Sequence, residues 1–129
     1  MSKINKHRSV VVIPARFGSS RFPGKPLVKL LGKPLILWVA ELSAIAVGSQ
    51  NVYVATEDKR IVNMVQSANF QTIMTSKDAL TGTDRLAEAS QHIEADIYIN
   101  VQGDEPLVKP SDILKIRDAK IDQINKVIN

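Results

Sequence analysis

A short segment near the N-terminus combines the residue types that bind polyphosphates. Guanidinium and ammonium groups neutralise phosphate oxygens and donate hydrogen bonds to them. Glycines allow backbone N–H groups to approach the same oxygens closely, and hydroxyl groups add further donors. Residues 16–25 hold all of these groups, namely Arg16, Arg21, Lys25, Gly18, Gly24, Ser19 and Ser20. The pattern predicts a cradle for a polyphosphate, with a solvated basic loop as the plainer alternative.

Two common phosphate-binding motifs do not fit this segment. A P-loop requires two glycines separated by four residues, followed by lysine and a hydroxyl residue. Here five residues separate Gly18 from Gly24, and Pro26 follows Lys25 where the hydroxyl would hold Mg²⁺. The glycine pattern that opens a dinucleotide-binding helix is missing as well. The sequence therefore argues against a P-loop ATPase and against an NAD-dependent enzyme.

A second segment, residues 100–106, places two carboxylates beside a glycine after a predicted strand. Asp104 and Glu105 follow Gly103, and Mg²⁺ is commonly held by one or two carboxylates together with substrate phosphates and water. Gln102 offers an amide that can read a base edge or a sugar hydroxyl. An acidic turn without a ligand is the alternative, but a polyphosphate cradle on a neighbouring strand favours Asp104 as a metal ligand.

A third segment, residues 81–88, predicts the entry into a helix with Thr83 or Asp84 as its cap. The N–H groups at such a helix start, together with Arg85, could help to bind an anion or a base. Asp84 and Glu88 are more simply interpreted as a cap and a surface charge.

These segments need a scaffold that brings them together, and the hydrophobic pattern predicts one. Residues 9–13 form a continuous β-branched run, which is typical of a strand buried on both faces. Strands and helices then alternate, which predicts a doubly wound, mostly parallel α/β sheet with helices on both faces. The further predicted strands are 51–55, 71–74 and 96–101, and the predicted helices are 34–47, 58–68 and 83–93. Ligands of such sheets bind outside the carboxyl ends of the strands, where the strand order reverses.

The last part of the chain predicts a helix that starts at Pro110 and then a new strand. The core face of this helix is predicted to consist of Ile113, Leu114, Ile116 and the aliphatic stem of Arg117. Residues 126–129 predict the beginning of another strand, so we expect a fold that is incomplete at the C-terminus. A strand without its neighbour would leave a sheet edge exposed.

Composition and charge exclude several classes of protein. The 129 residues have the length of one domain and carry a net charge of +4. Residues 1–33 hold eight Lys or Arg and no acidic residue, so the positive charge is local, unlike a uniformly basic nucleic-acid-binding surface. The chain has no cysteine and no apolar run as long as a membrane span. We therefore expect a cytoplasmic protein that binds neither nucleic acid nor membrane.

Three motifs together resemble one family, the 3-deoxy-manno-octulosonate (KDO) cytidylyltransferases, also called CMP-KDO synthetases. The motifs are IPARFGSSRFPGKPL at residues 13–27, TGTDRLAE at 81–88 and NVQGDEP at 100–106. Their order and spacing make the match specific from residue 9 onward. The related CMP-sialic acid synthetases, which stay an alternative, usually continue the first motif with a Gly-Gly-Ser-Lys pattern that this chain lacks.

The resemblance implies a Rossmann-like nucleotidyltransferase fold and a defined reaction. In that reaction CTP and KDO give CMP-KDO and pyrophosphate in the presence of Mg²⁺, for lipopolysaccharide or capsule synthesis. The resemblance implies catalytic roles for Arg16, Lys25 and Asp104, with Asp104 as the metal ligand. The nucleotide-binding residues that it implies are Ala15, Arg16, Ser19, Ser20, Arg21, Lys25, Arg85 and Gln102.

Family members are longer than this chain, and the resemblance covers their nucleotide-binding half. It divides the sequence into a basic arm at residues 1–8 and half of a cytidylyltransferase domain at residues 9–129. It implies that most KDO-binding residues, a second metal ligand and the surface of a homodimer lie in the other half. We therefore expect this chain to bind CTP and to turn over poorly, with a non-catalytic nucleotide- or anion-binding module as the alternative.

Overall fold

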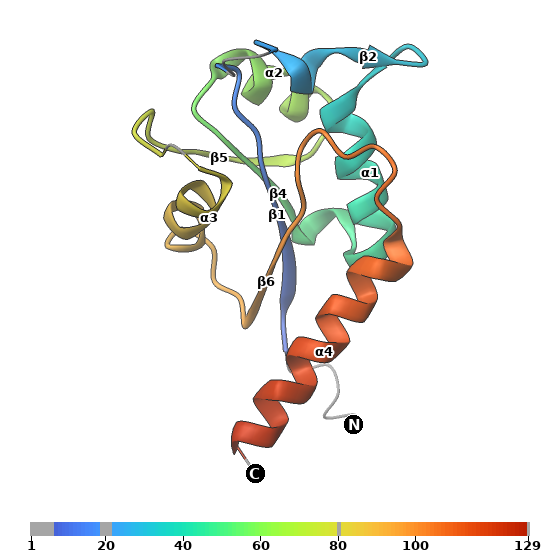
Figure 1. Cartoon of the computed structure of the whole chain (residues 1–129), viewed down its shortest axis with the longest axis vertical. Helices are drawn as coiled ribbons and strands as arrows, with labels where there is room; N and C mark the ends of the chain where they lie inside the picture. The colour runs from blue at the N-terminus through green and yellow to red at the C-terminus, as the bar shows by residue number, and fades with distance from the viewer. Residues whose placement is uncertain (1–6, 19–21, 80, 129) are drawn as a thin grey trace.

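The computed structural model describes residues 7–18, 22–79 and 81–128, which form a parallel sheet with helices on both faces (Figure 1). The sheet has the order β5-β4-β1-β6, and each neighbouring pair is parallel. Its strands are β1 (Ser9–Pro14), β4 (Val52–Thr56), β5 (Gln71–Met74) and β6 (Ile97–Asn100). The chain runs from β1 outward to β5 and returns to the other side of β1, so the strand order reverses between β1 and β6. The predicted doubly wound sheet is confirmed.

The central strand β1 has all six of its residues buried. Val11 and Ile13 belong to the hydrophobic cluster on one face of the sheet, whereas Val10 and Val12 belong to the cluster on the other. This division follows from the alternation of side chains along a strand. The prediction of a strand buried on both faces is therefore confirmed.

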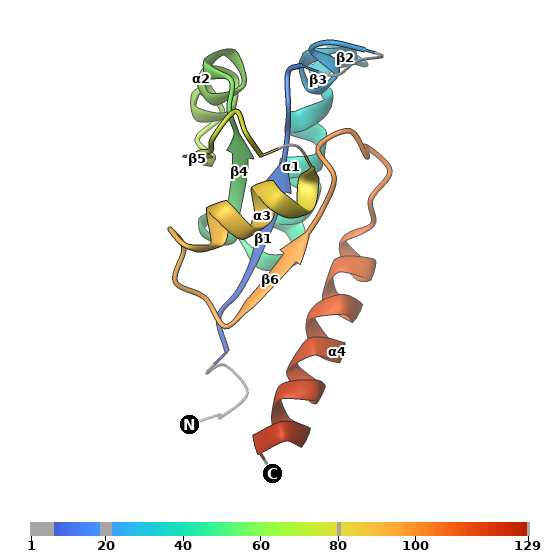
Figure 2. The ribbon, with the colours of Figure 1, turned by 60° about the vertical axis from the view of Figure 1, so that its left-hand side comes forward.

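Among the described residues, the two core clusters place three α-helices on one face of the sheet and one on the other, and Figure 2 shows helices on both sides. Ile36, Ile61 and Ile113 bring the first three helices into the same core cluster, while Ala89 packs with Val12 on the opposite face. The first three are α1 (Leu35–Val47), α2 (Lys59–Ser67) and α4 (Pro110–Ile128), and the fourth is α3 (Gly82–Ser90).

The prediction of a strand at residues 126–129 is wrong, because α4 continues to Ile128. Ile121 and Ile124 pack against the same core as the buried Ile113, and their helical spacing extends the helix beyond its first turns. Two β-branched residues at the end of the chain are too few to oppose that continuation. The predicted core face also needs correction, since Ile116 is 43% exposed.

The start of α3 differs from the prediction by a few residues. Thr81 is the cap, and its hydroxyl accepts a hydrogen bond of 3.0 Å from the backbone N–H of Asp84. The predicted caps, Thr83 and Asp84, lie inside the first turn of the helix. The predicted caps are therefore wrong by two or three residues, because the Thr81 hydroxyl already satisfies a backbone N–H of the first turn.

Short elements connect β1 to α1. The short elements are η2 (Lys25–Leu27), β2 (Lys29–Leu30), β3 (Lys33–Pro34) and, after α1, η3 (Ser49–Asn51). Strands β2 and β3 form a hairpin that turns through Leu31 and Gly32, whose φ values are positive, at 53° and 80° respectively.

No helix of the described residues has the length and apolar character needed to cross a membrane.

Candidate nucleotide-binding site

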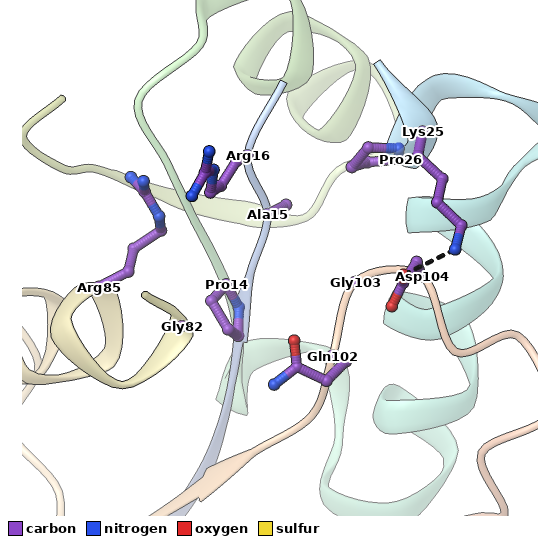
Figure 3. Close-up of a pocket in the computed structure, with 10 residues that line it drawn as sticks. All are labelled: Pro14, Ala15, Arg16, Lys25, Pro26, Gly82, Arg85, Gln102, Gly103 and Asp104. Atoms are coloured by element: carbon purple, nitrogen blue, oxygen red, sulfur yellow. Dashed lines mark ion pairs between the residues drawn. The ribbon is translucent and has the colours of Figure 1, made fainter. Parts of the chain in front are cut away.

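A pocket of about 290 Å³ opens at the carboxyl ends of β1 and β6, where the strand order reverses (Figure 3). Ligands of doubly wound sheets bind at this position. The loop after β1, η2, the start of α3 and the loop after β6 all contribute to its wall. The lining residues are Pro14, Ala15, Arg16, Lys25, Pro26, Gly82, Arg85, Gln102, Gly103 and Asp104. The fold thus brings the three sequence segments to one place.

Lys25 and Asp104 form an ion pair that joins η2 to the loop after β6 (Figure 3). Lys25 Nζ lies 3.0 Å from Asp104 Oδ2, and the side chains are 44% and 45% exposed. A bound ligand can therefore reach either charge. An exposed pair of this kind contributes at most about 1 kcal/mol to stability, so exchanging it for ligand contacts has a small cost.

Gly103 allows the loop after β6 to lie directly against β1. A β-carbon at Gly103 would come within 3.1 Å of the Pro14 carbonyl oxygen and 3.2 Å of both Ala15 Cβ and Ile36 Cδ1. These distances are tighter than ordinary van der Waals contact, so a larger residue would displace the loop or its neighbours. Gln102 and Asp104 flank this glycine, and its close packing therefore places both side chains at the pocket.

Arg16 lies on the side of the pocket opposite to the ion pair (Figure 3). Its Nε donates a hydrogen bond of 3.1 Å to the Gly18 carbonyl oxygen, which ties the side chain to the loop after β1. Ala15 continues the register of the sheet, because its N–H donates to the Ala55 carbonyl oxygen at the end of β4 over 2.9 Å. Both residues therefore lie at the pocket.

Arg85 lines the pocket, but most of its guanidinium group bonds to the protein. The residue is 1% exposed, and its Nη2 donates to the Ala79 carbonyl oxygen over 2.8 Å. Its Nη1 donates to the Thr75 hydroxyl and lies 3.9 Å from Glu57 Oε1. Among the described residues, its Nε is buried without a hydrogen-bond partner. Arg85 thus ties α3 to the segment after β5, and the expected proximity to cytidine stays a prediction.

Three predicted phosphate ligands, Ser19, Ser20 and Arg21, lie outside the described residues. Within the described ranges, no three histidine, aspartate or glutamate side chains gather in a way that could hold a metal ion.

A contact that the sequence did not predict supports the loop after β1. The guanidinium carbon of Arg60, in the first turn of α2, lies 3.3 Å from the centre of the Phe17 ring. Asp58 caps α2 by accepting a hydrogen bond of 2.8 Å from the Arg60 N–H, and it also pairs with the guanidinium group. The side-chain hydrogen bond from Arg60 holds the pKa of Asp58 below its usual value. A helix start is visible in the sequence here, but its contact with Phe17 is not.

The chain matches the family model for cytidylyltransferases over residues 10–126. It belongs to the cytidylyltransferase family. The 3-deoxy-manno-octulosonate cytidylyltransferase of Escherichia coli is 51% identical over 106 residues, which are 82% of this chain and 43% of that protein. An 8-amino-3,8-dideoxy-manno-octulosonate cytidylyltransferase of Shewanella sp. (strain W3-18-1) is 50% identical over 107 residues, covering 81% of this chain and 44% of that protein.

A solved structure gives the same result in three dimensions. The structure of a CMP:2-keto-3-deoxy-manno-octonic acid synthetase complexed with CTP matches with a TM-score of 0.85 and 48% identity. The match covers 89% of this cytidylyltransferase chain and 48% of that one. The Rossmann-like nucleotidyltransferase fold and the resemblance to KDO cytidylyltransferases are confirmed. The chain spans under half the length of these three relatives.

Proposed function

We propose that this chain provides the CTP-binding half of a KDO cytidylyltransferase, which converts CTP and KDO into CMP-KDO and pyrophosphate. The observation that carries the proposal is the pocket between β1 and β6, which is lined by Arg16 on one side and by the Lys25–Asp104 ion pair on the other. This is the position at which doubly wound sheets bind nucleotides. The similarity to a synthetase whose structure contains CTP supports the choice of nucleotide.

On this proposal the cations of the pocket neutralise the triphosphate of CTP. Arg16 and Lys25 lie on opposite sides of the pocket, so they can contact different phosphate groups (Figure 3). Gln102 binds the cytidine, since its amide offers both a donor and an acceptor to the edge of cytosine. Arg85, which also lines the pocket, is the second proposed contact to the cytidine. The further nucleotide-binding residues of the proposal are Ala15, Ser19, Ser20 and Arg21.

Asp104 is the proposed Mg²⁺ ligand, and the donor set of the pocket fits this ion. The carboxylate is 45% exposed, and a triphosphate can take over its partner, Lys25. One carboxylate with phosphate oxygens and water is a common arrangement around Mg²⁺. When bound, the ion supplies positive charge that stabilises the negative charge on the phosphate oxygens.

The proposed reaction is a nucleotidyl transfer. The anomeric hydroxyl oxygen of KDO forms a bond to the α-phosphorus of CTP, the bond to the β-phosphate oxygen breaks, and the hydroxyl proton is lost to water. Such transfers depend mainly on positioning and on charge neutralisation. Lys25 and Arg16 suit this task because their charges stabilise the pyrophosphate that leaves.

The remaining parts of the proposal concern the whole enzyme. We expect the additional polypeptide found in the longer relatives to bind the acidic eight-carbon sugar and to form a homodimer. We expect the enzyme to act in the cytoplasm, in lipopolysaccharide or capsule synthesis. Relatives named for KDO and for its 8-amino analogue are 51% and 50% identical, so the proposed sugar substrate includes both compounds.

Thermal unfolding of the 129-residue chain with CTP, UTP, ATP or GTP and Mg²⁺ tests this proposal. A ligand at about 100 times its Kd stabilises the folded state by about 2.7 kcal/mol, so CTP is expected to raise Tm by several degrees. The other nucleotides are expected to raise Tm much less at the same concentration. Equal shifts with all four would support a non-selective polyphosphate-binding module, and no shift with CTP would contradict the proposal.

A further inference from the structure

Arg60 lies outside the pocket but supports the loop that leads into it. Its Nε and Nη2 donate hydrogen bonds of 3.0 and 2.7 Å to the two carboxylate oxygens of Asp58. The same guanidinium group lies 3.3 Å from the centre of the Phe17 ring. A guanidinium held by both oxygens of a carboxylate keeps its plane fixed, and it binds an aromatic face favourably. Arg60 therefore fixes the position of the Phe17 ring.

The Phe17 ring in turn fixes the start of η2. The N–H of Gly24 donates a hydrogen bond of 2.7 Å to the Phe17 carbonyl oxygen. Gly24 has a φ of 74°, and a β-carbon there would come within 2.8 Å of Phe17 Cε2. Gly24 is the N-cap residue of η2 and directly precedes Lys25. The backbone and the ring of Phe17 therefore both contact the residue that directly precedes Lys25.

We propose that Arg60 is a positioning residue for Lys25. Through Phe17 and Gly24 it holds the Lys25 ammonium group beside Asp104, at the place where the triphosphate binds. The inference rests on the proposed function only in that Lys25 contacts the phosphates of CTP. Arg60 itself touches no substrate, and its effect on binding reaches the ligand through Lys25 alone.

Binding measurements with CTP and CMP test the effect on the ligand. Arg60→Met keeps the aliphatic stem and removes the planar cation, and we expect it to weaken CTP binding by about 5-fold, within the range of one cation–π contact. CMP binding is expected to stay unchanged, because CMP lacks the β- and γ-phosphates. Arg117→Met, which changes an arginine paired with the adjacent Asp118 on α4, is the matched control and is expected to alter neither affinity.

Two further variants separate positioning from other roles of Arg60. Lys25→Met in combination with Arg60→Met is expected to bind CTP as weakly as Lys25→Met alone, because the two residues act as one unit. Additive losses would instead mean that Arg60 contacts the nucleotide directly, and a parallel loss of CMP binding would mean a general structural role. Arg60→Lys is expected to recover only part of the affinity, and full recovery would show that charge alone matters.

A second readout needs no nucleotide. The rate at which formaldehyde and a borohydride methylate Lys25 Nζ, followed by mass spectrometry, reports how well Asp104 holds this amine. We expect Arg60→Met to speed the methylation of Lys25 several-fold and to leave Lys126, which pairs with Asp122 on α4, unchanged. An unchanged rate at Lys25 would overturn the inference. If the unaltered chain fails to bind CTP, the proposed function is wrong, while this labelling result still decides the role of Arg60.

Discussion

Two residues of opposite charge, Lys25 and Asp104, dominate the pocket at the scale of single residues. Their ion pair is close to half exposed. Changes at these positions can therefore alter ligand binding without a large effect on folding. A substitution at Asp104 can therefore test the proposed metal ligand while the fold is kept.

Asp104→Asn removes the negative charge and keeps the shape of the side chain. We expect Tm of the free chain to change little, whereas the additional stabilisation by CTP that depends on Mg²⁺ is lost. Thermal unfolding with CTP, in the presence and absence of Mg²⁺, measures this difference. Glu105→Gln, which neutralises the neighbouring exposed carboxylate, is the control and keeps the metal dependence. If the Asp104→Asn chain also keeps it, the metal binds elsewhere.

Gly103→Ala tests the close packing of the loop after β6 against β1. The added methyl group would come within 3.1 Å of the Pro14 carbonyl oxygen, and overpacking of this kind costs about 1–3 kcal/mol of stability. We expect a lower urea midpoint and weaker CTP binding. Gly18→Ala is the matched control for stability alone, because a β-carbon there meets no atom within 4 Å but Gly18 belongs to the proposed phosphate-binding loop. Equal stability of the two variants would show that the loop can move freely.

The sequence predicted most of the described pocket because its residues directly follow strands. Arg16 follows β1 closely, and Gln102 and Asp104 follow β6, so a parallel sheet must bring them to one edge. The sequence could not predict the contact between Phe17 and Arg60. That contact depends on how α2 packs beside η2, which neither residue type nor spacing reports.

At the scale of elements, one side chain of α3 both stabilises the fold and lines the pocket. The guanidinium group of Arg85 joins α3 to the segment after β5 and lines the pocket at the same time. One side chain therefore holds the first turn of α3 in place and forms part of the pocket wall. A substitution of Arg85 that is intended to weaken nucleotide binding is also expected to disturb the packing of α3.

Arg85→Met is expected to destabilise the fold strongly. It leaves the Thr75 hydroxyl and the Ala79 carbonyl oxygen without their donor and Glu57 without its nearby cation, and such losses cost about 3 kcal/mol. Urea unfolding measures the change, with Arg117→Met, at a partly exposed arginine of α4, as the control. A fall in CTP affinity at unchanged stability would instead show that Arg85 serves mainly as a nucleotide ligand.

Asp58 makes the stability of the α2 start depend on pH. Because its pKa is lowered in the folded state, mainly by the hydrogen bond from Arg60, its contribution is present above the unfolded pKa of about 3.9. That contribution is lost as the pH falls through the lowered folded value. Urea unfolding from neutral pH to about pH 2 should show the advantage of the native chain over Asp58→Asn shrinking in this acidic range. An advantage independent of pH would contradict this explanation.

The elements also show where local patterns mislead. Strands β1, β4, β5 and β6 were predicted within about two residues because β-branched runs between turn residues are strong signals. Val127 and Ile128 gave the same signal without being a strand. An established helix continues through such residues at little cost, since propagation is easier than nucleation. The helix formed by the residues before Val127 therefore determines the backbone conformation of Val127 and Ile128.

At the scale of the whole chain, the prediction concerns how fast these 129 residues can form CMP-KDO. The chain contains the pocket but spans under half the length of its relatives. We expect it to bind CTP and to form CMP-KDO at least about 100-fold more slowly than the E. coli relative, because the second substrate would not be held in place. Pyrophosphate release with CTP, KDO and Mg²⁺, measured side by side, tests this expectation. Comparable rates would show that these 129 residues also bind the sugar.

The ion pair between Lys25 and Asp104 has a consequence for how ligands bind together. In the free chain each residue satisfies the charge of the other, so a triphosphate that takes Lys25 leaves Asp104 uncompensated, and a cation that takes Asp104 leaves Lys25 uncompensated. Binding of both removes both penalties. Their affinities must then be thermodynamically coupled, so the factor by which Mg²⁺ tightens CTP equals the factor by which CTP tightens Mg²⁺. If the proposed function is right, the pocket is expected to bind the metal–nucleotide complex more tightly than either component alone.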